Sequence, residues 1–129
     1  GGGAKGLKII LDRLLGGAGI ILFPEGTRTM DGRLQPARSG IGLTVIKSTA
    51  PVVPVRVFGT FEAYGKDAKF PKPYKIAAKY GRPMWFHELR TEAKTCSKAR
   101  LKEIYQEVAD AIMAQIAKLE PCEDKDQFP

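Results

Sequence analysis

Residues 23–28 read Phe23-Pro24-Glu25-Gly26-Thr27-Arg28 and come at the end of the apolar run 20–23. A short continuous apolar run predicts a strand that is buried on both faces of a sheet. Pro24 and Gly26 then predict an abrupt turn, which places a carboxylate and a guanidinium just beyond the strand. Because ligands of open α/β sheets bind at the carboxyl ends of strands, the stretch predicts an α/β fold and an anion site.

The segments on either side of this turn predict a strand–helix–strand unit. Residues 4–15 carry one apolar stripe at helical spacing, and Gly16-Gly17 ends that helix. Ser39 is expected to cap a second helix, which Pro51 stops. The valine-rich run 52–58 predicts the second strand. Since such crossovers join parallel strands, we expect an α/β fold with a partial, mainly parallel twisted sheet flanked by helices.

The rest of the chain completes one domain. Residues 59–73 interleave aromatic and lysine side chains, so they predict either a loop at a membrane interface or an ordinary lysine-rich surface loop. Residues 74–80 predict a third strand, and the apolar face of 98–119 predicts a long helix. We therefore expect a domain over 1–119 and a polar, acidic tail over 120–129.

Composition and charge narrow the classes of partner. A chain of 129 residues with 43% hydrophobic residues is long enough for one core, and it has no apolar run that could span a bilayer. The net charge is +7, and the basic excess lies within residues 28–82. This excess favours an anionic partner, although solvated lysines that keep a small domain soluble give the same pattern. Cys96 and Cys122 are expected to be free thiols in a reducing compartment, and no metal is expected.

Three charged residues near the turn are candidates for the anion site. Arg28 offers a planar fork of donors that suits a phosphate. Arg38 lies just before the expected start of the second helix, where the helix dipole adds to its charge. Glu25 cannot bind a phosphate directly, but it could accept a hydrogen bond from a substrate hydroxyl, or it could orient Arg28. A turn closed by a local Glu25–Arg28 pair is the structural alternative.

Residues 23–28 resemble the phosphate-binding motif of the glycerolipid acyltransferase family, which includes 1-acylglycerol-3-phosphate and glycerol-3-phosphate acyltransferases. Residues 37–40 resemble the basic residue and glycine that follow in the family. Residues 50–55 resemble its proline-containing strand motif, and residues 80–83 resemble its Gly-x-Pro. The resemblance covers about 4–86.

This resemblance implies transfer of a fatty acyl group to lysophosphatidate or a similar glycerol phosphate acceptor in phospholipid synthesis. The donor would be acyl-CoA or an acyl carrier protein thioester, with no other cofactor. A membrane surface is an implied partner, on the cytoplasmic side, with the protein peripheral or anchored by segments outside this chain. The residues implied to bind the acceptor are Glu25, Gly26, Thr27, Arg28 and Arg38.

The family's general base is the histidine of an Asn-His-x-x-x-x-Asp motif that precedes the phosphate-binding motif. His87 is the one histidine of this chain, but it follows the motif and lacks the leading Asn. We therefore expect His87 to be a surface residue, assign no catalytic residue, and expect the base motif to fall before Gly1. On this reading the chain alone would be inactive.

Two other functions stay open. A non-catalytic phosphate- or lipid-binding remnant would keep the anion site without the base. A small basic nucleic-acid-binding domain fits the charge, but the sequence has no recognition helix, RNA-binding strand motif or basic arm. We therefore expect no nucleic-acid partner.

Overall fold

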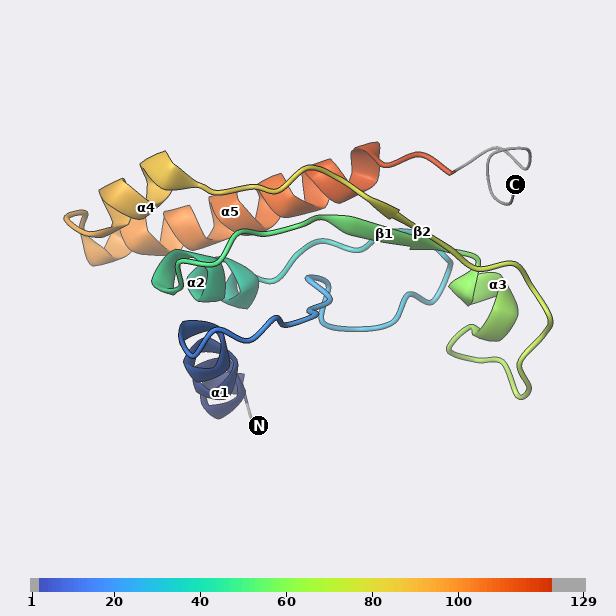
Figure 1. The fold of residues 1–129 in the computed structure, drawn as a ribbon. Helices are drawn as coiled ribbons and strands as arrows, with labels where there is room; N and C mark the ends of the chain where they lie inside the picture. Colours follow the sequence, from blue (N-terminus) through green and yellow to red (C-terminus); the bar gives the residue numbers. More distant parts are fainter. Residues whose placement is uncertain (1–2, 122–129) are drawn as a thin grey trace.

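The structure is a computed structural model that describes residues 3–121. This part of the chain holds five helices and a two-stranded sheet (Figure 1). In chain order the elements are α1 (Gly3–Leu15), α2 (Ser39–Lys47), β1 (Val55–Phe58), α3 (Thr60–Tyr64), β2 (Ala77–Tyr80), α4 (His87–Ala93) and α5 (Lys98–Lys118). The predicted α/β class is confirmed.

The core lies where α2 packs against the long helix α5. Four residues of α5 at intervals of one helical turn point into it, and Val45 of α2 meets them. The buried residues of α5 in this cluster are Ile104, Val108, Ile112 and Ile116. Gly42 lets the two helices approach closely, because a side chain there would overlap the main chain of Tyr105.

Both ends of α5 are fixed by hydrogen bonds. At the start, Ser97 is the N-cap residue and accepts from the amide of Arg100 at 3.2 Å. At the end, the Arg56 guanidinium donates to the carbonyls of Ala117 and Leu119, both at 3.1 Å. Since Arg56 belongs to β1, these bonds also attach the sheet to the helix.

The pairing of the sheet differs from the prediction. β1 and β2 pair antiparallel, with Val55 opposite Tyr80 and Phe58 opposite Ala77. The predicted parallel ladder between 20–23 and 52–58 is wrong. Residues 20–23 have no partner strand within the described part of the chain, so their backbone forms no ladder. Alternate side chains of this segment are exposed, Ile21 by 88% and Phe23 by 71%, while Ile20 and Leu22 are half-buried.

Two other local expectations change. The predicted loop 59–73 contains the helix α3. The N-cap of α2 is Arg38 rather than Ser39. His87, expected to be a surface residue, is exposed at the start of the helix α4. The predicted tail 120–129, with Cys122, lies almost wholly outside the described residues, while Cys96 is a free thiol.

A half-buried arginine, Arg90, holds α4 in place. Nη2 of Arg90 donates to the carbonyl of Val45 at 3.0 Å and to that of Ala50 at 2.6 Å. Burial lowers the pKa of Arg90, and its Nε has no hydrogen-bond partner. These contacts close the C-terminal end of α2 against α4.

The elements lie along α5 (Figure 1). α4 lies beside the N-terminal part of α5, and α3 with the loop that follows it projects at the far end of the molecule. α1 packs on α2. None of the helices in residues 3–121 combines the length and the hydropathy needed to cross a bilayer.

Candidate functional site

The turn at residues 23–28 is tight and depends on a glycine. The amide of Gly26 donates to the carbonyl of Phe23 at 3.0 Å. Gly26 has φ +72°, and a Cβ there would lie 2.8 Å from Nε of Arg38. A residue with a side chain would therefore be strained and would displace the arginine. Gly26 brings the Arg38 guanidinium against the main chain of the turn.

Glu25 closes the loop that follows the turn. Its Oε2 accepts from the amide of Gln35 at 2.6 Å, and the amide of Arg38 donates to the carbonyl of Pro24 at 2.9 Å. Among the described ion pairs there is none between Glu25 and Arg28. The structural alternative of a local Glu25–Arg28 pair is therefore not what the structure shows.

Arg28 is held from a distant part of the chain. Its Nη2 donates to the carbonyl of Tyr64 at 2.5 Å, and its guanidinium carbon lies 5.6 Å from the centre of the Tyr64 ring. A guanidinium has five N–H donors. The remaining N–H groups stay available for an anion.

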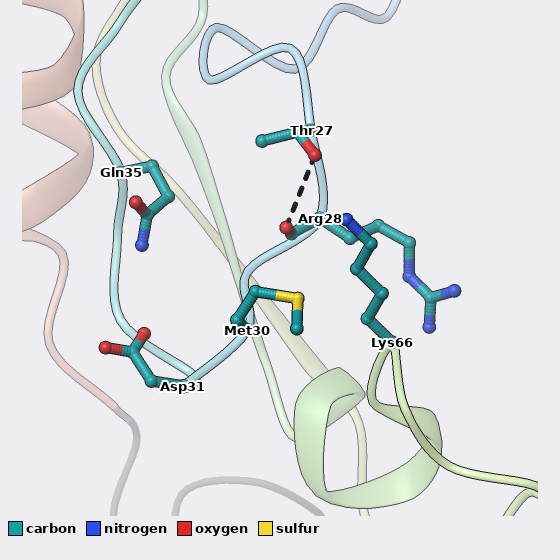
Figure 2. Close-up of a pocket in the computed structure, with 6 residues that line it drawn as sticks. All are labelled: Thr27, Arg28, Met30, Asp31, Gln35 and Lys66. Atoms are coloured by element: carbon teal, nitrogen blue, oxygen red, sulfur yellow. Dashed lines mark hydrogen bonds between the residues drawn. The ribbon is translucent and has the colours of Figure 1, made fainter.

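A cavity of about 280 Å³ opens beside Arg28 (Figure 2). Its volume is close to the roughly 300 Å³ at which small-molecule sites begin. The loop after the turn and the loop after α3 form its walls. The residues that line it are Thr27, Arg28, Met30, Asp31, Gln35 and Lys66.

Lys66 is a site residue that the sequence analysis missed. In Figure 2 its side chain rises from the loop after α3 toward the backbone of Thr27 and Arg28. It therefore adds a second positive charge to the same cavity. The only sequence signal was the run of lysines at 66, 69, 72 and 75, which does not distinguish one lysine from another.

The cavity also holds one carboxylate. Asp31 accepts from the amide of Arg33 and from the hydroxyl of Thr29, both at 3.0 Å. These hydrogen bonds lower its pKa, so it stays ionised at neutral pH. Figure 2 shows Asp31 on the Gln35 side of the cavity, with Met30 between it and the two cations. One acid against two cations leaves the cavity with a net positive charge.

An apolar groove of about 400 Å³ lies beside the same turn. It runs between α1 and the start of α2, and Arg38 and Gly26 belong to its lining. The apolar side chains of the groove are Leu7, Ile10, Leu22, Phe23, Pro24 and Ile41. Gly3 and Gly6 keep the α1 side open, because a Cβ at either position would meet nothing within 4 Å.

The structure thus divides the predicted site residues. Thr27 and Arg28 line the polar cavity, whereas Gly26 and Arg38 line the apolar groove. Glu25 lines neither of them. His87 is exposed at the start of α4, and its ring stacks on that of Trp85 with the ring centroids 5.9 Å apart. It lines neither the polar cavity nor the apolar groove.

Comparison with known proteins points to one family. Residues 2–58, which include the 23–28 turn, match the family described as Acyltransferase. A 1-acyl-sn-glycerol-3-phosphate acyltransferase of Limnanthes douglasii is 35% identical over 80 residues, which are 62% of this chain and 27% of that protein. A chloroplastic 1-acyl-sn-glycerol-3-phosphate acyltransferase of Brassica napus is 43% identical over 54 residues, 42% of this chain and 16% of that one. The chain therefore spans about a quarter or less of these relatives.

A solved structure agrees with this match. The 1-acyl-sn-glycerophosphate acyltransferase PlsC of Thermotoga maritima superimposes with a TM-score of 0.62 at 25% sequence identity. The match covers 90% of this chain and 46% of that protein. The similarity therefore extends beyond residues 2–58 to most of the fold.

Proposed function

We propose that this chain belongs to the glycerolipid acyltransferase family, whose members it resembles in sequence and fold, and that it serves in the transfer of a fatty acyl group to lysophosphatidate or a similar glycerol phosphate acceptor. The donor in this proposal is acyl-CoA or acyl carrier protein. The reaction belongs to phospholipid synthesis on the cytoplasmic side of a membrane. In this proposal, the residues at the turn bind the acceptor and not the donor.

One observation carries the proposal: a cationic cavity and an apolar groove lie on either side of one turn. Thr27 and Arg28 line the cavity, and the adjoining Gly26 lines the groove. Lysophosphatidate has the same two parts, a phosphate and an acyl chain joined by a glycerol. Its phosphate fits the cavity and its chain fits the groove, with the glycerol over Gly26 and Thr27.

We assign a separate role to each predicted residue. Arg28 binds two phosphate oxygens through its free N–H groups, and the Thr27 hydroxyl donates to a third. Gly26 allows the acceptor and Arg38 to approach the main chain, while Arg38 supplies charge at the mouth of the groove. Glu25 positions the loop through Gln35, and its second carboxylate oxygen accepts a hydrogen bond from a hydroxyl of the acceptor.

The proton acceptor is proposed to lie outside these residues. Attack of a glycerol hydroxyl on a thioester needs a general base, which typically contributes about 10²–10⁴-fold. No histidine is among the residues that line the cavity or the groove. We therefore propose that the 129-residue chain alone binds the acceptor and does not transfer the acyl group.

An acceptor comparison tests this function. With this chain placed in a polypeptide that also supplies a general base, acyl transfer is measured with lysophosphatidate and with monoacylglycerol, which has the same acyl chain but no phosphate. We expect kcat/KM for lysophosphatidate to be more than about tenfold higher, because one charge-assisted contact contributes about 1.5–3 kcal/mol. Equal rates for the two acceptors would contradict the proposal, and acyl transfer by the 129-residue chain alone would contradict the placement of the base.

A further inference from the structure

We propose that the loop over residues 65–76, here called the interface loop, docks the protein on an anionic lipid bilayer. The proposal deepens the membrane location given above by naming the part of the chain that meets the lipid. It also identifies the partner by its chemistry, an acidic headgroup layer over an apolar interior.

Apolar and basic side chains project together from this loop. Phe70 is 77% exposed, Tyr74 56% and Ile76 55%. All three lie in a segment whose other residues are also exposed from 69 to 76. An aliphatic and two aromatic side chains of this kind sit well at the boundary between headgroups and acyl chains. The lysines among them are Lys66, Lys69, Lys72 and Lys75, against the single acid Asp67.

The shape of the loop keeps these side chains exposed. Pro71 and Pro73 cannot donate a ladder hydrogen bond, so the segment does not extend the pairing of β2. At its base, Gly59 has φ +90° and packs against the carbonyl of Lys75. The amide of Lys72 also donates to the carbonyl of Ala63 at 2.6 Å. The loop is therefore closed at its neck and projects at one end of the molecule (Figure 1).

The interface loop is also joined to the cationic cavity beside Arg28. Lys66 belongs to both, and Tyr64, the last residue of α3 and the one before the loop, holds Arg28. Beneath it, the Phe61 ring lies 3.1 Å from the position of a Cβ on Gly32, which fixes α3 against the loop after the turn. A bilayer that contacts Phe70 and Ile76 would therefore lie against a loop that supplies Lys66 to the lining of the cavity.

The mixture of side chains favours a lipid surface over a nucleic acid. Lysines supply attraction to either polyanion, but the aliphatic Ile76 cannot stack on a base and gains free energy only by leaving water. Within the interface loop there is no arginine or asparagine that would read a base edge.

Vesicle binding by the full chain, without acceptor or donor, tests the proposal. Co-sedimentation is measured with phosphatidylcholine vesicles that contain roughly one third phosphatidylglycerol, and with phosphatidylcholine alone. Lys69→Glu/Lys72→Glu should weaken binding to the anionic vesicles by about 25-fold or more, since each lysine near the surface contributes about fivefold. The double variant Phe70→Ser/Ile76→Ser should weaken vesicle binding at both low and high salt, because salt does not screen the burial of apolar side chains. Lys98→Glu/Lys102→Glu on α5 makes the same change of charge and should bind like the wild type.

A fluorescent reporter provides the second measurement. The chain has a single tryptophan, Trp85, next to α4 at the other end of the molecule. Phe70→Trp in a Trp85→Phe background should shift its emission to the blue on anionic vesicles and be quenched by brominated lipid, whereas Trp85 in the wild type should do neither. The proposal is overturned if the indole introduced by Phe70→Trp shows no shift, if the α5 variant weakens binding as much as the loop variant, or if RNA binds more tightly than the vesicles. Because no acyl transfer is measured, failure here leaves the proposed reaction standing.

Discussion

The guanidinium of Arg28 donates to the main-chain carbonyl of Tyr64, which lies 36 residues farther along the chain. The Tyr64 ring lies against the same guanidinium. Together they fix the orientation of Arg28 from α3, an element that the motif itself does not contain. The cavity is therefore assembled from two loops, and its second cation, Lys66, comes with Tyr64.

Lys66 should contribute to phosphate affinity. Lys66→Met is expected to weaken binding of glycerol 3-phosphate by roughly threefold to tenfold, because an exposed ammonium on a flexible stem contributes less than a held guanidinium. The matched control is Lys69→Met, in the same loop but outside the cavity lining. Titration calorimetry compares the two variants, and equal losses would show that Lys66 acts only through the general positive field.

The apolar groove should select for the acyl chain of the acceptor. Gly6→Trp puts an indole into the groove, where a Cβ meets nothing within 4 Å. We expect roughly tenfold weaker binding of lysophosphatidate and unchanged binding of glycerol 3-phosphate, which has no chain. Lys8→Trp, on the exposed side of α1, should change neither affinity. If Gly6→Trp weakens both ligands equally, the groove does not hold the chain.

Gly42 should be required for packing, and Gly40 should not. Gly42→Ala is expected to destabilise the fold by about 1–3 kcal/mol, because its Cβ would overlap the Tyr105 carbonyl of α5. Gly40→Ala in the same helix makes ordinary contact with Leu7 at 3.5 Å. It should be neutral or stabilising by up to about 1 kcal/mol, because alanine favours the helix. Urea unfolding measures both, and a tolerated Gly42→Ala would contradict the observed approach of α2 to α5.

Three of the five helices could be predicted from the sequence, and the rest of the fold could not. α1, α2 and α5 have apolar residues at helical spacing on one face, so the pattern itself defines them. That face is buried in α2 and α5 and half-buried in α1. α4 is short, and what holds it is the pair of bonds from Arg90 to the carbonyls of Val45 and Ala50. Those bonds span at least 40 residues, so no local pattern contains them.

The prediction of the first strand was wrong and the prediction of the site was incomplete for the same reason, because both depend on partners elsewhere in the chain. Residues 20–23 have a strand composition, but a ladder also needs a neighbour, and the described chain offers none. The motif pointed to Arg28, which the structure places in the lining of the cationic cavity, whereas its neighbours Tyr64 and Lys66 follow only from the fold. The binding roles of Glu25, Gly26, Thr27, Arg28 and Arg38 stay predictions.

An acid-labile ion pair should connect α4 to α5. Arg100 donates to both oxygens of Glu92, and this lowers the pKa of the Glu92 carboxyl below its ordinary value of 4.5. A depressed pKa in the folded state contributes stability at higher pH, and that stability is lost as the pH falls through the folded pKa. Thermal melts of the wild type should therefore lose stability below about pH 4.5 more steeply than those of Glu92→Gln. Glu88→Gln, in the same helix, should melt like the wild type, and identical pH profiles for Glu92→Gln and the wild type would contradict the pairing.

The central claim is that Arg28 binds the phosphate of the acceptor, and one titration tests it most directly. Glycerol 3-phosphate is titrated into the wild type, Arg28→Ala and Arg33→Ala, the last an exposed arginine of the same loop that is absent from the cavity lining. We predict affinity more than about tenfold weaker for Arg28→Ala, because a charge-assisted contact of about 1.5–3 kcal/mol is lost, and affinity close to the wild type for Arg33→Ala. Unchanged affinity for Arg28→Ala, or an equal loss for Arg33→Ala, would contradict the claim.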